Sequence, residues 1–168
     1  MVPGMIGVER LLTIGVYGFT AETFFDTLAQ SGVDVVCDVR ARRGVRGSEY
    51  AFANARRLQD ALEARGIHYV HLPHLAPSDA TRAAAFRTDR ELGIPARARA
   101  TMSEEYVAGY EADVLADLAP QAVLAELGQY GAAPAILCVE RTPGGCHRSL
   151  LAARLAAEGG LEVEHLTP

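Results

Sequence analysis

The residues best suited to chemistry lie near the C-terminus, in the stretch C-V-E-R-T-P-G-G-C-H-R-S at 138–149. Cys146 is expected at the start of a helix, where free backbone amides and the helix dipole lower a thiol pKa and attract anions. His147 could deprotonate that thiol or act as a general acid and base. Cys146 and His147 are therefore the candidate catalytic residues. The candidate ligand-binding residues of this stretch are Glu140, Arg148 and Ser149. The alternative is a structural turn in which Cys146 is buried and His147 caps a neighbouring group.

A second constellation, C-D-V-R-A-R-R-G-V-R-G-S-E-Y at 37–50, holds four arginines against two acidic residues. It therefore carries a net charge of +2 in a chain of −5. Asp38 precedes Arg40 by two residues at the end of a predicted strand, where a carboxylate can orient a guanidinium through two hydrogen bonds. We predict that Arg40 and Asp38 belong to an anion-binding site. The alternative is a solvated loop with Asp38 bound to its own backbone.

Histidines mark a third stretch, H-Y-V-H-L-P-H at 68–74. His68 and His71 are three residues apart on a predicted strand, so they face opposite sides and are poor joint metal ligands. His71, next to the strand end, is the third candidate catalytic residue, as an acid or base. A zinc site formed by His71, His74 and Cys146 is conceivable, but no zinc-ligand spacing supports it. We predict no metal site.

Composition restricts the chemistry further. All sixteen basic residues are arginines, which excludes lysine Schiff bases, pyridoxal phosphate attachment and a P-loop lysine. An anion would be held by guanidinium groups, backbone amides or histidine, and no cofactor is predicted. The expected ligand is an anionic small molecule or a nucleotide, whereas the net charge of −5 does not support binding of nucleic acid. Of the three cysteines, Cys37 and Cys138 lie in apolar runs and are predicted to be core residues.

The length of 168 residues predicts a single domain. No apolar run approaches the roughly 18 residues needed to span a bilayer. Residues 1–10 show no basic segment before an apolar stretch, so a secretory signal is not expected and the predicted location is the cytoplasm. Nothing in the sequence indicates an oligomeric state.

Predicted strands alternate with predicted helices along the whole chain, which favours an α/β fold with a mostly parallel central sheet of about five strands and helices on both faces. Strands are expected at 11–16, 33–39, 67–72, 135–140 and 161–166, and helices at 21–30, 53–65, 78–92, 102–118, 120–130 and 149–158. In such folds the ligand lies beyond the carboxyl ends of the strands. The loops at 40–50, 73–78 and 141–148 occupy that position, so we predict that they form the site.

The predicted helix at 102–118 carries two tyrosines, Tyr106 and Tyr110, spaced so that they share one face. They are expected to pack in the core or in an interface. A stacking platform for a nucleobase is the alternative.

Four pieces in the same order resemble the domain of unknown function 488 family: T-I-G at 13–15, C-D-V-R at 37–40, Y-V-H-L-P at 69–73 and the stretch at 138–149. The resemblance covers nearly the whole chain and implies a parallel α/β fold without implying an activity. Rhodanese domains are more distantly similar, with an early Asp-Val-Arg strand and a cysteine loop before a late helix. The spacing of either cysteine to Arg148 does not match a rhodanese loop, so sulfur transfer is an analogy at fold level alone.

Three hypotheses about function follow. The chain could be an enzyme acting on a phosphate-bearing or otherwise anionic substrate. It could be a non-catalytic module that binds an anion or nucleic acid with the same arginines. In the third hypothesis the Cys-His-Arg turn is purely structural.

Overall fold

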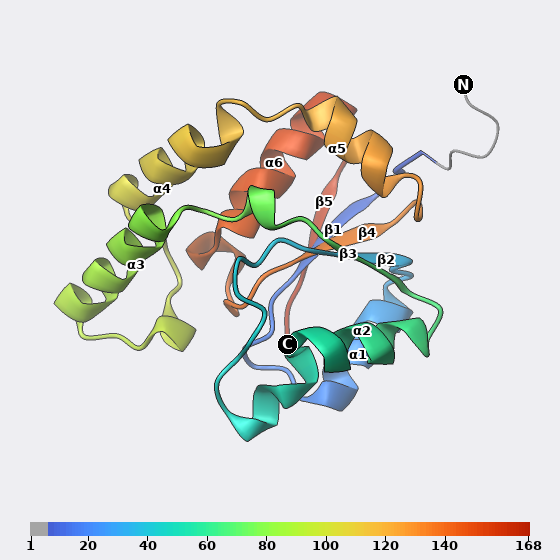
Figure 1. Cartoon of the computed structure of the whole chain (residues 1–168), viewed down its shortest axis with the longest axis horizontal. Coiled ribbons are helices and arrows are strands. Elements are labelled where there is room, and N and C mark those ends of the chain that lie inside the picture. The colour runs from blue at the N-terminus through green and yellow to red at the C-terminus, as the bar shows by residue number, and fades with distance from the viewer. Residues whose placement is uncertain (1–6) are drawn as a thin grey trace.

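The computed structural model of the chain describes residues 7–168, so part of the segment assessed for a signal, residues 1–6, lies outside the described residues. Five parallel strands form one sheet in the order β3-β2-β4-β1-β5 (Figure 1). The strands are β1 (Leu11–Ile14), β2 (Val35–Asp38), β3 (His68–His71), β4 (Pro134–Leu137) and β5 (Val163–Leu166). The predicted α/β fold with a parallel sheet of about five strands is confirmed.

Helices cover both faces of this sheet (Figure 1). They are α1 (Ala21–Gln30), α2 (Ala55–Glu63), α3 (Asp79–Leu92), α4 (Glu104–Tyr110), α5 (Pro120–Leu127) and α6 (His147–Gly159). Phe24 of α1 and Leu58 of α2 belong to one buried cluster, whereas Leu127 of α5 and Leu151 of α6 belong to another. The central strands are buried in full and contribute alternate residues to the two clusters, as expected for a parallel sheet between two helical layers.

The predicted helix at 102–118 is interrupted in the structure. Helix α4 ends at Tyr110, and the chain continues in a wider, π-helical turn over Glu111–Leu115. The predicted helix at 149–158 also begins earlier than expected, because α6 starts at His147. Its early start places Cys146 at the N-cap and His147 in the first helical turn, which fixes the direction of both side chains.

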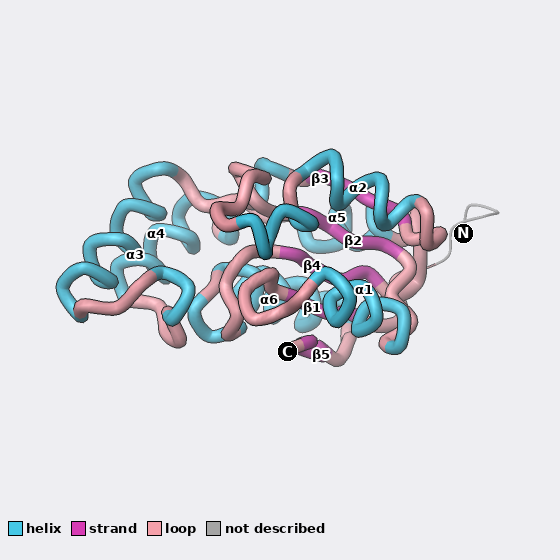
Figure 2. Tube along the Cα trace, turned by 90° about the horizontal axis from the view of Figure 1, so that it is seen from below, coloured by secondary structure: helices cyan, strands magenta, loops and turns pink. Residues whose placement is uncertain are grey.

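Helices α3 and α4 lie side by side and project from the body of the protein (Figures 1 and 2). Ser78 caps α3 by accepting a hydrogen bond from the amide of Thr81, and Gly93 ends the helix in the left-handed conformation. Asp113 binds both the Ser78 amide and the Thr81 hydroxyl, at 3.0 and 2.6 Å. The two helices therefore form an arm whose base is held by hydrogen bonds. Within residues 7–168 no helix has the length and apolarity needed to cross a membrane.

Candidate functional site

The site begins at the carboxyl ends of β2 and β4, which are neighbours in the sheet. Asp38 pairs with Leu137 in the register of the two strands, and the amide of Val39 donates to the carbonyl of Leu137. The residues that follow, Arg40 after β2 and Cys138 after β4, therefore emerge at the same edge. This is the edge at which parallel α/β proteins bind ligands.

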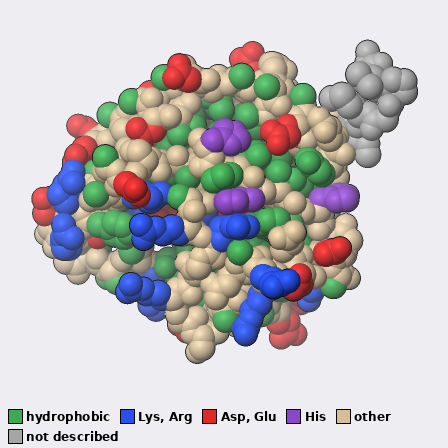
Figure 3. Space-filling view, viewed as in Figure 1, with side chains coloured by type: hydrophobic (Ala, Val, Ile, Leu, Met, Phe, Trp, Pro, Cys, Tyr) green, Lys and Arg blue, Asp and Glu red, His purple; other side chains and the backbone are tan. Residues whose placement is uncertain are grey.

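A cavity of about 720 Å³ lies at this edge. Its wall contains six arginines but only two acidic residues, Asp79 and Glu140. The space-filling view shows basic side chains gathered around a hollow between the arm and the sheet (Figure 3). The arginines are Arg40, Arg42, Arg46, Arg82, Arg97 and Arg99. The wall thus has a strong excess of positive charge in a protein that is acidic as a whole.

The predicted loops contribute unequally to this cavity. The loop after β2 supplies six lining residues, three of them arginines (Arg40, Arg42 and Arg46), whereas the segment 73–78 contributes only Pro77. From the C-terminal stretch, Glu140 and His147 reach the wall. The remaining wall comes mainly from α3 and from the turn at 95–99, with Tyr17 and Tyr106 in addition. Neither α3 nor this turn was predicted to belong to the site.

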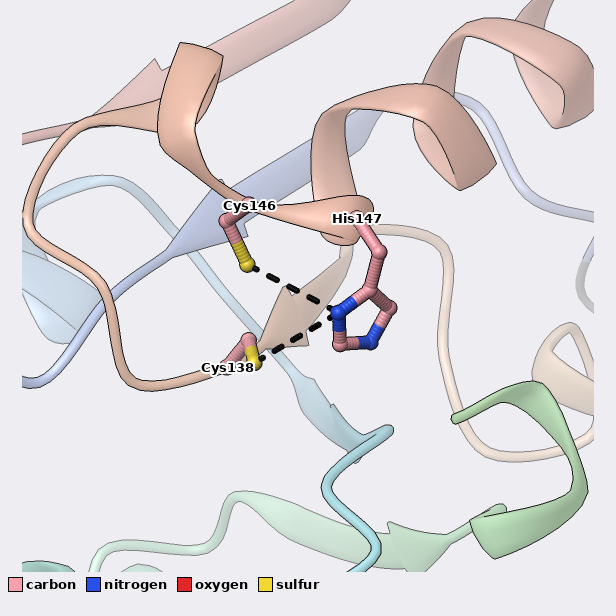
Figure 4. A group of neighbouring side chains, drawn as sticks. All are labelled: Cys138, Cys146 and His147. Carbon is pink, nitrogen blue, oxygen red and sulfur yellow. Dashed lines mark hydrogen bonds between the residues drawn. The ribbon is translucent and has the colours of Figure 1, made fainter. Parts of the chain in front are cut away.

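Cys138, Cys146 and His147 form a buried cluster next to the cavity (Figure 4). Their sulfur and nitrogen atoms all lie within 4.8 Å of one another. Nδ1 of His147 is 3.9 Å from the Sγ of each cysteine and 3.3 Å from the hydroxyl oxygen of Tyr106. Cys138 and His147 line the cavity, whereas Cys146 lies behind them.

The electrostatics of the cluster favour a thiolate on Cys146. Burial alone raises the pKa of this thiol, but hydrogen bonding with Cys138 and the positive charges of His147 and Arg148 lower it well below its ordinary value. For His147, burial lowers the pKa of the imidazole. The negative charge of the neighbouring Cys146 thiolate outweighs this effect, so the net shift of the pKa is upward. A buried thiolate and imidazolium therefore stabilise each other.

Glu140 connects the cluster to the arm. Its carboxylate accepts hydrogen bonds from the Cys138 thiol at 3.5 Å and from Arg99 at 3.1 Å. Burial, reinforced by the negative charge of Cys146, raises the pKa of Glu140 to about 7. Arg99 binds Asp89 of α3 through two further hydrogen bonds of 3.0 and 2.5 Å. Arg99 thus links α3 of the arm to Glu140, which lines the cavity.

Asp38 orients Arg40 through two hydrogen bonds, as the sequence predicts. The Arg40 Nε and Nη2 atoms donate to the two carboxylate oxygens at 2.8 and 2.7 Å, and Nη1 donates to the carbonyl of Ala53 at 2.9 Å. Asp38 itself does not line the cavity, and it also accepts a hydrogen bond from the Tyr69 hydroxyl. Arg40 is 2% exposed, so its charge contributes to the cavity from within the wall.

Three other candidate residues do not line the cavity, and the side chain of each contacts nearby backbone. Arg148 is fully buried and donates to the carbonyls of Glu140 and Arg141 at 2.7 and 3.4 Å. The Ser149 hydroxyl donates to the carbonyl of Cys146, and a ring nitrogen of His71 lies 2.9 Å from the carbonyl oxygen of Arg40. Each of these side chains fixes a loop of the site in place.

Gly15, which ends the T-I-G piece, permits the tight packing behind Glu140. A Cβ atom at this position would lie 1.9 Å from the carbonyl oxygen of Glu140 and 3.2 Å from Nη2 of Arg148. Only glycine lets the end of β1 approach the 138–149 stretch so closely. The glycine therefore belongs to the scaffold of the site.

Sequence reasoning missed Cys138 and Arg99. Cys138 is buried, as predicted, but it also lines the cavity, and its sulfur lies 3.9 Å from Nδ1 of His147. Alternation along the end of β4 could have indicated this, because it places Cys138 and Glu140 on the same side. Arg99 carried no such signal, since its partners Asp89 and Glu140 are distant in the sequence. Tyr106 and Tyr110 are both buried, as expected of core residues.

A family model described as "Domain of unknown function DUF488" matches residues 20–155. No protein in the curated set matches the chain. No solved structure matches it either.

Proposed function

The chain belongs to the DUF488 family, and because that description carries no activity, we propose a function from the cavity itself. The cavity binds a small anionic ligand, with a phosphate-bearing molecule such as a nucleotide as the best fit. The observation that carries the proposal is the wall of six arginines facing two acidic residues. Such an excess of guanidinium groups suits phosphate, because each group can donate two parallel hydrogen bonds.

Three of the arginines are free to meet a ligand. Arg42, Arg46 and Arg97 are exposed, and none of them forms an ion pair within residues 7–168. The other three bind carboxylates, of Asp38, Asp79 and Asp89 respectively. A ligand would therefore neutralise the rim without breaking the ion pairs of the wall.

The size and the apolar lining of the cavity support a ligand larger than an inorganic ion. Its volume of about 720 Å³ falls among those of small-molecule sites, roughly 300–1,000 Å³. Phe86 lines the cavity while 50% exposed, and the half-buried Tyr17 lines it as well. An aromatic surface beside cations is the combination that a nucleotide base and its phosphates require.

The test is a thermal-shift and calorimetric panel of phosphate, pyrophosphate, nucleoside mono-, di- and triphosphates, and a short oligonucleotide. A ligand that binds the folded state raises the midpoint by mass action. The variant Arg42→Ala/Arg97→Ala should weaken binding at least about tenfold, since a hydrogen bond to a charged group contributes roughly 1.5–3 kcal/mol. The matched control Arg56→Ala/Arg57→Ala removes the same charge from the exposed surface of α2 and should keep the affinity.

Two results would contradict the proposal: an unchanged wild-type midpoint across the panel, or an equal loss of affinity in both double variants. A binding ligand also separates an enzyme from a non-catalytic module. Conversion of the ligand by the wild type, and its loss in Glu140→Gln, would identify an enzyme. Binding without conversion would identify the module.

A further inference from the structure

We propose that Cys138, Cys146 and His147 bind one thiophilic divalent metal ion, with zinc as the best fit, and that the open coordination position faces the arginine-lined cavity. The inference deepens the proposed function, because it places a metal beside the bound anion. It stands on the donor atoms, their spacing and their position relative to the cavity.

The spacing is close to that of a metal site. Zinc bonds of about 2.3 Å to sulfur and about 2.0–2.1 Å to nitrogen place tetrahedral ligands about 3.5–3.8 Å apart. Both cysteine sulfurs lie 3.9 Å from the same nitrogen, Nδ1 of His147 (Figure 4). To surround an ion, the two nitrogen–sulfur distances would contract by a few tenths of an ångström, and the sulfur–sulfur distance would close from its present value of at most 4.8 Å.

Pairing with the Cys146 thiolate uses the single proton of Nδ1 and leaves its other close polar neighbours without an explanation. An imidazole nitrogen carries either one proton or one lone pair, so it satisfies one partner well. Here Nδ1 faces three polar atoms, the two sulfurs and the hydroxyl oxygen of Tyr106 at 3.3 Å. The two sulfurs and Nδ1 lie within 4.8 Å of one another, so all three atoms are close enough together to bind one ion placed between them.

The donor set indicates both the metal and its use. Two thiolates and an imidazole select zinc over hard cations, which prefer oxygen ligands. Three protein ligands also leave a fourth position open, as in catalytic rather than structural zinc sites. Cys138 and His147 line the cavity, and a carboxylate oxygen of Glu140 lies 3.5 Å from the Cys138 sulfur. The fourth position would thus be filled by Glu140, by water or by an anionic group of the ligand.

The third cysteine of the chain provides a matched control. Cys37 is also buried, but it lies within β2 and is not one of the clustered ligand residues. Its thiol should be irrelevant to metal binding. Replacing Cys37 or Cys138 by alanine removes the same atoms from a buried position, so the two variants differ in the cluster alone.

The experiment is titration of the reduced, chelator-treated full chain with Co²⁺ in the absence of any anionic ligand. We expect sulfur-to-cobalt charge-transfer absorption and the d–d bands of tetrahedral cobalt, saturating at one ion per chain and abolished by Zn²⁺. Cys37→Ala should keep these bands, whereas Cys138→Ala and His147→Ala should lose them.

Absence of charge-transfer absorption in the folded, reduced wild type would overturn the inference, as would retention of the bands in Cys138→Ala. Should the cluster variants not fold, the wild-type spectrum and its displacement by Zn²⁺ still decide the matter. Because this titration contains no anion and the ligand panel can be run on metal-free protein, failure of the metal site and failure of the anion site give different results.

Discussion

Asp38 and Arg40 form an ion pair through two parallel hydrogen bonds at the end of β2, and both side chains are almost completely removed from solvent. Asp38→Asn should destabilise the fold by about 3–5 kcal/mol, because it leaves the buried guanidinium without a countercharge. Urea unfolding measures this loss. The control is Glu164→Gln, which breaks the exposed pair with Arg10 and should cost about 0–1 kcal/mol. Similar losses in both variants would show that the Asp38–Arg40 pair contributes no more than a surface pair.

Arg99 connects the arm to the sheet by binding both Asp89 of α3 and Glu140. Arg99→Ala leaves Asp89 buried without a partner and frees Glu140 from the arm. Amide hydrogen exchange within α3 should accelerate about tenfold, which corresponds to about 1.4 kcal/mol of local opening free energy. The control Arg87→Ala removes the more exposed contact between Arg87 and Glu105 and should have little effect. Unchanged exchange in α3 would show that other contacts fix the arm.

Substitution of Gly15 tests whether the close packing between the end of β1 and the backbone of Glu140 is essential for stability. Gly15→Ala places a methyl group against the backbone of Glu140, which cannot move aside like a flexible side chain. We expect a loss of about 1–3 kcal/mol in denaturant unfolding, the usual cost of overpacking. Gly44→Ala serves as the control, since a Cβ atom there meets nothing within 4 Å. Equal stability of the two variants would show that the backbone of the 138–149 stretch can shift to make room for the added methyl group at little cost in free energy.

Asp113 makes the base of the arm sensitive to acid. Burial raises the pKa of this carboxyl, but hydrogen bonds from the Thr81 hydroxyl and from Ser78 outweigh it and lower the pKa. A carboxyl whose pKa is lower in the folded state stabilises the fold above its unfolded pKa of about 3.9, and this stability disappears as the pH falls through the folded pKa. Asp113→Asn should therefore lower stability at pH 7 and flatten its decline below about pH 4. An unchanged acid profile would contradict this assignment.

Much of the fold and part of the site could be predicted from the sequence. The alternation of apolar runs and capped helices is local, so it fixed the order of strands and helices and therefore which strand ends share an edge. The spacing of Asp38 and Arg40 likewise predicted their pairing, because two residues on one side of a strand end lie within reach of each other. Residue types in the stretch 138–149 identified His147 and Glu140, which reach the cavity.

The tertiary structure decided which side chains face the ligand space. Arg148 is turned inward to the carbonyl of Glu140, whereas Cys138, predicted as a core residue, reaches the cavity and His147. Arg99 joins the site from a turn that only the packing of the arm brings to the sheet. These outcomes depend on contacts between residues far apart in the chain, and local periodicity carries no information about such contacts. The sequence alone therefore determined the elements and the edge where they meet, and long-range packing determined the chemistry presented there.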